Sequence, residues 1–374
     1  MKKFVKSFIT SLMIGIPVVI CLCVLLYLKS DHEKTDSIQT TPVLIKDSLE
    51  NGDDEASSES ENITKTADSV TLSFAGDVHF SELVTQKYDA SGISAIIDDE
   101  MLSHMQNADF MVLNHEFVFS TQGEAMEDKE YTLRNHPEYV KILQDLGTDA
   151  VSIANNHVLD FGKDAFLDTL ETLENAEIAY TGGGRNLEEA SKPVIREIGG
   201  QTFAIFAATR VSPSADWYAG KQKPGILQTY DAAALNKAIA EADTQYDHVI
   251  VFVHWGIERM EIPEEYQRTL AKGYIDAGAD LIIGAHPHIL QGFEYYKDVP
   301  ICYSLGNYLF GNRTDETLLL NAIFDGNGTL SIELIPCKRI NGVLTKIQEP
   351  ENFFNHLTDI SFDAAVSHNG ILIQ

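Results

Sequence analysis

The chain has 374 residues, of which 44% are hydrophobic and 22% are charged, and its formal net charge is −29 at pH 7. This length and composition suit one large or two ordinary globular domains with a proper buried core. The negative charge argues against nucleic acid or an anionic surface as a partner, because long-range repulsion would oppose the encounter. An anionic substrate would therefore need local help from a metal ion or from arginines.

The N-terminus predicts a membrane anchor. Residues 1–7 are rich in lysine, and residues 8–28 form an uncharged apolar stretch that is long enough to cross a bilayer as a helix. An uncleaved anchor is favoured over a cleaved signal peptide, because the stretch exceeds the usual apolar part of a signal peptide and no small-residue cleavage pattern follows it. The lysines favour a cytoplasmic N-terminus, so we expect a single-pass protein of the cell membrane whose C-terminal domain is extracellular.

Residues 29–69 are polar and acidic and show no periodic apolar face. This composition predicts a disordered linker between the anchor and the folded part of the chain. A specific cation-binding role for its carboxylates is the less favoured alternative, because runs of like charge are usually solvated.

Two of the four cysteines, Cys302 and Cys337, lie outside the predicted anchor. This number excludes a disulfide framework and a thiolate metal site. The sequence leaves open whether the two form a single disulfide.

From residue 70 onward, short apolar runs alternate with amphipathic helical patterns, which predicts a layered α/β domain. The helical patterns include DAFLDTLETLENA and PEEYQRTLAKGYIDAGA, and the predicted strands are VTLSFAGD, FMVLNHE, AVSIANNH, TFAIFAAT, HVIVFVHWG, LIIGAHPH and ICYSLGN. The segment LLLNAIFDGNGTLSIELIPCKR predicts a hairpin across Asn-Gly, as an antiparallel finish to the same domain. We place the domain at residues 70–345 and treat residues 346–374 as a C-terminal extension.

Polar side chains of the kinds that bind metals follow five of the predicted strands. They are Asp77 and His79, then Asn114, His115 and Glu116, then Asn155, Asn156 and His157, then His254, and finally His286 and His288. In α/β sheets, sites form at the carboxyl ends of the strands, so loops far apart in the sequence converge there. Since the sequence has no competing cluster elsewhere, the pattern favours a site over scattered structural polar residues.

The donors in this set are imidazole nitrogens and carboxylate and amide oxygens, without thiolate. This mixture suits Mn, Fe or Zn more than Ca or Cu(I). The number of donors exceeds what one tetrahedral ion uses. We therefore expect two divalent transition-metal ions bridged by a carboxylate.

The order of the motifs GDVHF, NHEF, ANNHVLDFG, HWG and GAHPH, with GGGRNLEEA at 182–190 and SLGNYLF at 304–310, resembles that of the CapA family, also called PgsA. These are membrane-anchored proteins of poly-γ-glutamate capsule synthesis, and their outer domain is related to the calcineurin-like metallophosphoesterases. The resemblance covers residues 70 to 345. It implies a four-layer α-β-β-α sandwich.

The resemblance also implies roles for individual residues. The ligands would be Asp77, His79 and His288 for the first metal and Asn156, His254 and His286 for the second. Glu116 stands where the superfamily has its bridging aspartate, so the bridge would be one methylene longer. His157 would donate a proton to the leaving group, and Asp160 would hold the His157 ring in one tautomer. The segment ANNH, whose acid follows only at Asp160, also departs from the superfamily's usual Gly-Asn-His-Asp/Glu.

Two arginines are candidates for substrate contact. Arg134 in YTLRNHPEY and Arg210 in AATRVSPSADWY lie in predicted loops. Either could clamp a carboxylate or phosphate through two parallel hydrogen bonds. A surface ion pair is the alternative for both.

Three functions from different classes follow. The resemblance favours a membrane-anchored extracellular protein that takes part in poly-γ-glutamate synthesis or export, with the polymer and membrane synthase subunits as partners. The first alternative is a metal-dependent hydrolase of an extracellular phosphoester or amide, with His157 as the acid. The second is a non-catalytic scaffold of a synthase complex. Whether the protein is an enzyme stays open at this point.

Overall fold

The computed structural model describes residues 69–311 and 316–374. The predicted anchor at residues 8–28 and the predicted linker as far as residue 68 lie outside the described residues. Within the described part of the chain, no helix is both long and apolar enough to span a membrane.

The first of two large β-sheets has the strand order β18-β17-β16-β1-β2-β5-β6, and β15 pairs with the end of β1. Its strands are β1 (Val70–His79), β2 (Phe110–His115), β5 (Ala150–Ser152), β6 (Ala179–Thr181), β15 (Asn307–Phe310), β16 (Glu316–Phe324), β17 (Leu330–Ile340) and β18 (Val343–Lys346). The strands β1, β2, β5 and β6 run parallel, whereas β16, β17 and β18 continue the sheet in antiparallel fashion. This sheet is therefore mixed.

The second large sheet has the order β13-β14-β12-β11-β9-β8. Its strands are β8 (Val194–Ile198), β9 (Gln201–Thr209), β11 (His248–His254), β12 (Leu281–Ala285), β13 (Leu290–Tyr296) and β14 (Val299–Leu305). The four central strands are parallel, and the edge strands β8 and β13 are antiparallel to their neighbours. Three two-stranded sheets complete the described strands: β3 (Val118–Phe119) with β4 (Arg134–Asn135), β7 (Gly183–Gly184) with β10 (Gly225–Ile226), and β19 (Ala365–Val366) with β20 (Leu372–Ile373).

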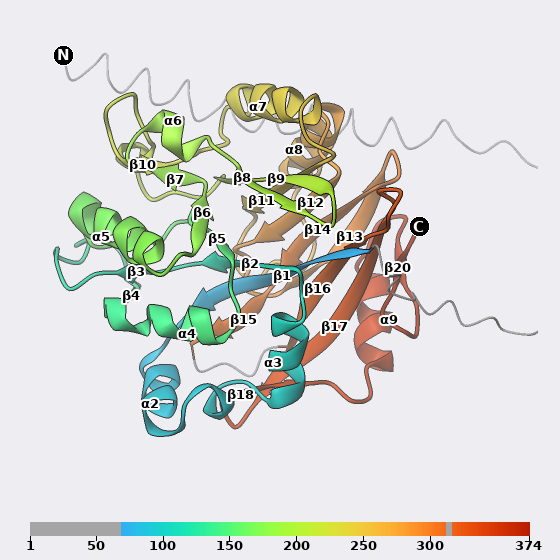
Figure 1. The fold of residues 1–374 in the computed structure, drawn as a ribbon, viewed down its shortest axis with the longest axis horizontal. Helices are drawn as coiled ribbons and strands as arrows, with labels where there is room; N and C mark the ends of the chain where they lie inside the picture. The colour runs from blue at the N-terminus through green and yellow to red at the C-terminus, as the bar shows by residue number, and fades with distance from the viewer. Residues whose placement is uncertain (1–68, 312–315) are drawn as a thin grey trace, which may run out of the picture. The chain divides into compact units, whose positions relative to one another are not determined.

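Helices cover the outer faces of both large sheets (Figure 1). On the first sheet these are α2 (Glu82–Ser91), α3 (Asp99–Gln106), α4 (Val140–Asp145) and α5 (Gly162–Asn175), and on the second they are α7 (Ala233–Asp243) and α8 (Glu265–Asp276). The shorter helices are α6 (Leu187–Ala190) and the 3₁₀ turns η1 (Ile93–Ala95), η2 (Pro137–Tyr139) and η3 (Ala215–Trp217). The layers follow the order helix, sheet, sheet, helix.

The side chains of β11 show why the layers form. Ile250 and Phe252 belong to the apolar core between the two sheets, whereas Val249 and Val251 belong to the core beneath α7 and α8. This alternation has the period of two expected of a strand that is buried on both faces. Phe252 meets Phe74 of β1 edge to face, with ring centroids 6.3 Å apart, so the contact joins the two sheets.

The segment from residue 346 to the C-terminus packs on this core. Helix α9 (Glu351–Asp359) contributes Phe353, Phe354 and Leu357 to the apolar cluster between the sheets. The stretch that the sequence sets apart as an extension therefore covers one end of the sandwich.

The structure confirms the α/β prediction. The predicted strands correspond to β1, β2, β5, β9, β11, β12 and β14, and the two quoted helical patterns correspond to α5 and α8. The predicted hairpin across Asn-Gly is the β16-β17 turn, where Gly328 has φ +82°. Cys302 and Cys337 are both free and buried, so they form no disulfide.

Candidate metal centre

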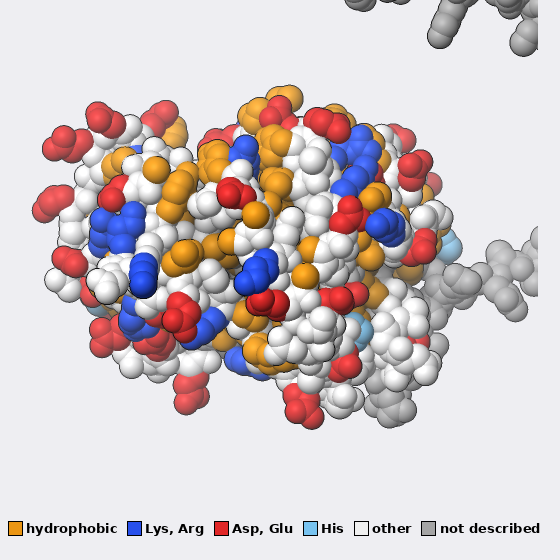
Figure 2. Space-filling view, turned by 90° about the horizontal axis from the view of Figure 1, so that it is seen from above, with side chains coloured by type: hydrophobic (Ala, Val, Ile, Leu, Met, Phe, Trp, Pro, Cys, Tyr) orange, Lys and Arg blue, Asp and Glu red, His pale blue; other side chains and the backbone are white. Residues whose placement is uncertain are grey.

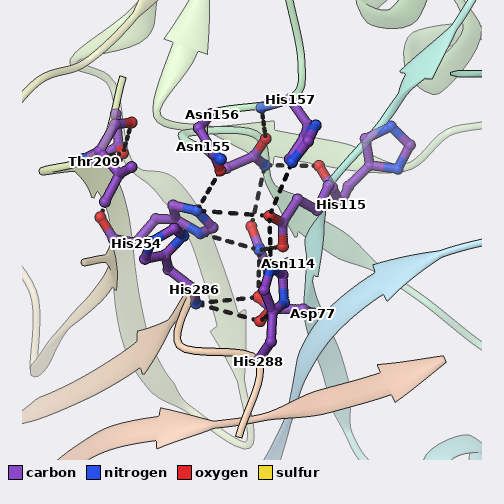
Figure 3. Close-up of polar contacts among 12 residues, drawn as sticks. Asp77, Asn114, His115, Asn155, Asn156, His157, Thr209, His254, His286 and His288 are labelled. Atoms are coloured by element: carbon purple, nitrogen blue, oxygen red, sulfur yellow. Dashed lines mark hydrogen bonds and ion pairs between the residues drawn. The ribbon is translucent and has the colours of Figure 1, made fainter. Parts of the chain in front are cut away.

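The carboxyl ends of β1 and β2 in the first sheet and of β11 and β12 in the second meet at one place (Figure 3). The backbone N–H of His286, after β12, points at the Asp77 carboxylate at the end of β1, with an N···Oδ2 distance of 3.3 Å. The loop after β5 reaches the same place through Asn156, whose Oδ1 atom lies 2.8 Å from His254 Nε2. The structure thus brings together residues from all the strand-end segments in which the sequence placed candidate ligands.

A local break in β1 places the Asp77 carboxylate. The register between β1 and β15 shifts at Asp77 and Val78, and such a bulge re-aims a side chain. Gly76 is required beside it, because a Cβ atom there would come within 2.0 Å of the Gly306 carbonyl oxygen. The close approach lets the Asp77 N–H donate to that oxygen at 2.9 Å.

The segment GAHPH carries backbone strain at both of its histidines. His286 has φ +100° and His288 has φ +58°. A non-glycine residue in this region costs on the order of 1–3 kcal/mol, and such strain gathers at functional sites. The strain is evidence that the turn serves the position of the two imidazoles rather than the stability of the fold.

The two buried carboxyls of the cluster, Asp77 and Glu116, differ in electrostatics. Burial raises the pKa of Asp77, but hydrogen bonds with His288 and Asn114 outweigh that effect and hold its pKa below the ordinary value. Burial raises the pKa of Glu116 well above its ordinary value, and the negative charge of Asp77 adds to the rise. A cation bound between them would favour the ionised form of both.

Asn114 connects these groups, although the sequence assigned it no role. Its Nδ2 atom lies 2.7 Å from Asp77 Oδ1, 3.2 Å from Glu116 Oε2 and 3.3 Å from His254 Nδ1. Because one amide nitrogen carries two N–H bonds, Asn114 can donate to both carboxyls at once. Its amide therefore holds the carboxyls close together.

Three buried imidazoles surround Glu116. Burial lowers the pKa of His286 to about 3, with a further contribution from His288, and burial lowers the pKa of His254 well below its ordinary value. His254 Nε2 and His288 Nε2 lie 3.7 and 3.8 Å from Glu116 Oε1, and His288 Nδ1 lies 3.2 Å from Asp77 Oδ2. An imidazole that stays neutral near pH 7 keeps a lone pair for a metal ion.

Two groups of potential ligand atoms overlap at Glu116. One comprises Glu116, His286 and His288, the other comprises Asp77, Glu116 and His254, and within each group the atoms lie within 4.8 Å of one another. Among the residues that the structure describes, Glu116 Oε1 and His286 Nδ1 are buried without a hydrogen-bond partner. An unpaired buried polar atom costs about 1–3 kcal/mol, which a bound cation would recover. The residues present therefore fit bound metal cations.

His157 lies beside this cluster, with its Nε2 atom 3.9 Å from Glu116 Oε1. Its other ring nitrogen, Nδ1, lies 2.7 Å from Asp160 Oδ2, and that oxygen also accepts the Leu133 N–H at 2.7 Å. Burial lowers the pKa of His157, and the hydrogen bond with Asp160 offsets only part of the effect. Asp160 thus holds the His157 ring at Nδ1, and the other ring nitrogen, Nε2, faces the cluster.

Lys129 is a residue of this site that sequence reasoning missed. Its Nζ atom lies 2.9 Å from His157 Nδ1 and donates to Asp160 Oδ1 and to the Asn156 carbonyl oxygen. An ammonium group has three N–H donors, so Lys129 ties the ligand loop to the proton-donor candidate. It stands in the acidic loop segment EDKEY, away from every strand end, so no motif marks it.

His79 belongs to neither group of ligand atoms. It is the last residue of β1, and its ring packs near those of Phe310 and Phe117, with centroids 5.5 and 5.9 Å away. Burial lowers its pKa to about 4. His115 faces away from the cluster (Figure 3), and neither of its ring nitrogens has a hydrogen-bond partner within the described residues.

The two candidate arginines differ in their surroundings. Arg134 is exposed, donates to the carbonyl oxygens of Gln122 and Gly123 at 3.2 Å, and lies over the ring of Phe161. These contacts account for Arg134 at the surface, where it begins the short strand β4 rather than lying in the predicted loop. Arg210 instead lies next to His254, and the backbone N–H of Arg210 donates to the His254 carbonyl oxygen at 2.8 Å.

A pocket of about 460 Å³ opens beside the cluster, and His157 and His288 line it. Its wall includes Glu258, Arg259 and Phe310, which the sequence did not single out. The Arg259 side chain donates to the His288 carbonyl oxygen at 3.2 Å, so the wall is attached to the ligand loop. The pocket gives a ligand direct access to the candidate centre.

The family model described as bacterial capsule synthesis protein PGA_cap matches residues 71–312. The chain is 33% identical to the PGA biosynthesis protein CapA of Bacillus subtilis (strain 168), over 73% of this chain and 72% of that one. It is 30% identical to the capsule biosynthesis protein CapA of Bacillus anthracis, over 71% and 67%. Among solved structures, it is similar to a hypothetical protein from Thermus thermophilus, with a TM-score of 0.46 and 14% identity over 72% of this chain and 100% of the other.

Proposed function

The chain belongs to the CapA family of bacterial capsule synthesis proteins, and from this membership we propose that it takes part in the synthesis or export of a poly-γ-glutamate capsule. The proposal includes anchoring to the cell membrane through residues 8–28, with the folded domain outside the cell and membrane synthase subunits as partners. The apolar N-terminal stretch and the names of the relatives support it.

Within this role, we propose a centre of two divalent transition-metal ions, of Mn, Fe or Zn. Its ligands would be Asp77 and His288 on one side and Asn156, His254 and His286 on the other, with Glu116 shared. The family resemblance adds His79, which lies in neither group of ligand atoms. When bound, such ions polarise a carbonyl or phosphoryl oxygen and lower the pKa of a water molecule. The observation that carries the proposal is the overlap of two ligand groups at Glu116, whose Oε1 atom is buried without a hydrogen-bond partner among the described residues.

Within this role, we propose that the reaction is hydrolysis of an amide bond in the polymer. Water adds its oxygen to the carbonyl carbon, the carbon–nitrogen bond breaks, and the leaving nitrogen must gain a proton. His157 faces the cluster through Nε2 and is held at Nδ1 by Asp160. In the proposed step, Nε2 accepts the proton that the attacking water loses and passes it to the leaving nitrogen. The pocket beside His157 and His288 is where we propose that the polymer chain enters. An amide is favoured over a phosphoester because poly-γ-glutamate contains amide bonds and no phosphoesters.

The test uses a cell that forms a poly-γ-glutamate capsule and from which the native gene is deleted. Wild-type protein is expected to restore normal surface polymer, whereas Asp77→Asn and His157→Ala are expected to alter its amount or chain length. Variants that restore the polymer fully would favour the scaffold function instead. A parallel assay follows new amino groups when metal-loaded protein meets the polymer, beside a panel of phosphoesters. Cleavage of phosphoesters alone would contradict the amide assignment.

A further inference from the structure

Arg210 follows β9 directly, at the same sheet edge as the candidate ligand His254. The strands β9 and β11 are parallel, with Thr209 in register with His254. Figure 3 shows Thr209 beside His254, and the Arg210 N–H donates to the His254 carbonyl oxygen at 2.8 Å. The backbone of Arg210 is therefore fixed against the candidate metal centre.

The guanidinium group of Arg210 lies among tyrosine rings. Its Cζ atom is 3.8 Å from the ring centroid of Tyr230 and 5.4 Å from that of Tyr266. The ring of Tyr218 lies 6.1 Å from that of Tyr230. Contacts with ring faces orient a guanidinium group but do not satisfy its N–H donors. These four residues are called the arginine-tyrosine subsite below.

Arg210 has no acidic partner among the residues that the structure describes, and its NH1 atom is buried without a hydrogen-bond partner. Some other cations have polar partners: Arg185 pairs with Glu174 at 2.7 Å, and Arg339, whose Nε atom is also buried without a partner among the described residues, donates to the carbonyl oxygens of Gly311 and Gly342. Figure 2 shows basic and acidic side chains interspersed over one whole face. A buried N–H without an acceptor is costly, so the unpaired NH1 atom of Arg210 points to an acceptor supplied by a ligand.

We propose that the arginine-tyrosine subsite binds a carboxylate of the polyglutamate chain and so holds that chain beside the metal centre. The proposal rests on the proposed function, since it takes the polymer as the ligand. One guanidinium group presents two parallel N–H donors and one positive charge, which match a single carboxylate. A phosphate dianion would call for further cations.

Each residue of poly-γ-glutamate carries a free α-carboxylate, so a bound chain presents one next to every amide bond. The positive charge of the subsite also reduces the repulsion between a polyanion and a protein of net charge −29. A local cation lowers that repulsion at the one place where the chain must bind.

The experiment measures binding, not turnover, by titration calorimetry with a short γ-glutamate oligomer. The protein is full-length and metal-loaded in a His157→Ala background, in which hydrolysis is slowed. We expect Arg210→Lys to weaken binding about tenfold or more, because the charge stays but the two parallel hydrogen bonds are lost.

Two ligand controls use protein that retains Arg210. The oligomer with amidated α-carboxylates should bind it as weakly as the acidic oligomer binds the Arg210→Lys variant. Equimolar inorganic phosphate should not displace the acidic oligomer. Arg185→Lys is the matched control, since that arginine is exposed and already paired with Glu174 at 2.7 Å, and it should leave binding unchanged.

Four results would each overturn the proposal. The Arg210→Lys protein could bind the acidic oligomer as tightly as the protein with Arg210, or the amidated oligomer could bind as tightly as the acidic one. Phosphate could displace the acidic oligomer, or neither oligomer could bind. If the variant does not fold, the two oligomers compared on protein that retains Arg210 still decide. Arg210-dependent binding without any polymer hydrolysis would support the subsite and contradict the hydrolytic function. Polymer hydrolysis with binding that does not depend on Arg210 would support the hydrolytic function and contradict the subsite.

Discussion

Glu116 and Glu294 are two buried glutamates for which the structure predicts opposite effects of the same substitution to glutamine. Burial and the charge of Asp77 raise the pKa of Glu116 well above its ordinary value of 4.5. As pH rises above 4.5, the unfolded chain therefore releases this proton before the folded one does, so the carboxyl lowers stability at neutral pH. Without metal, Glu116→Gln should raise the free energy of unfolding by about 1–3 kcal/mol, the range for an unsatisfied buried group.

Glu294 on β13 is the matched control, because its carboxylate is fully paired. It accepts from Arg268 at 2.8 and 3.0 Å and from the Tyr303 hydroxyl at 2.7 Å, and Lys272 lies 2.8 Å away. Burial raises its pKa, but these contacts outweigh burial and hold the pKa to about 2, against an ordinary 4.5. This lowering of the pKa corresponds to a stabilisation of the folded state by about 3 kcal/mol. Solvent screening at the partly exposed Arg268 and Lys272 reduces that contribution to about 2 kcal/mol.

Glu294→Gln should therefore destabilise the protein at pH 7, with or without metal. This contribution is fully present above pH 4.5 and is lost as pH falls towards 2. Glu116→Gln should in addition abolish stabilisation by added metal, which for wild type reaches about 2.7 kcal/mol per site at a hundredfold excess over Kd.

The assay is urea unfolding of the full-length protein in chelator and in Mn²⁺, at pH 7 and at lower pH. A Glu116→Gln protein that is less stable than wild type in chelator, or that still gains stability from the metal, would refute the electrostatic reasoning. A metal-dependent effect of Glu294→Gln would refute the choice of control.

Three further predictions concern the site itself. His157→Ala should lower the turnover of polymer by about 10²–10⁴-fold with unchanged metal content, and a joint loss of both would assign His157 to the ligands. His79→Ala should retain more metal than His288→Ala, since His79 lies in neither ligand group, and equal losses by elemental analysis would restore the role that the family resemblance implies. Lys129→Met should lower the thermal midpoint, because Asp160 Oδ1 loses a charged donor worth about 1.5–3 kcal/mol; an unchanged midpoint would contradict that role.

Much of the fold was predictable because it depends on local patterns. Alternating burial in β11 and the Asn-Gly turn at Gly328 follow from period and turn chemistry within a few residues. The meeting of Asp77 and Glu116 was predictable for a related reason, since neighbouring parallel strands share a carboxyl edge. His254 belongs to the other sheet and joins them because the two sheets pack face to face.

Other features were not predictable, because they depend on contacts between distant segments. Lys129 reaches His157 only because a long loop folds back over the ligand segment. The tyrosines around Arg210 come from separate loops and a helix, and the spacing of these residues along the sequence does not predict that they meet. Likewise, Phe353 of α9 enters the core between the sheets from a stretch that the sequence alone marks as an extension.

The central claim is that these strand ends hold metal, and metal content tests it most directly. Full-length protein is compared with Asp77→Asn and His286→Ala by elemental mass spectrometry after gel filtration. His356→Ala is the control, since His356 is exposed on α9 and pairs with Glu261 at 2.7 Å. We predict about two transition-metal ions per chain in wild type and control, and loss in both site variants. Wild-type protein without bound metal after incubation with Mn, Fe or Zn would contradict the claim.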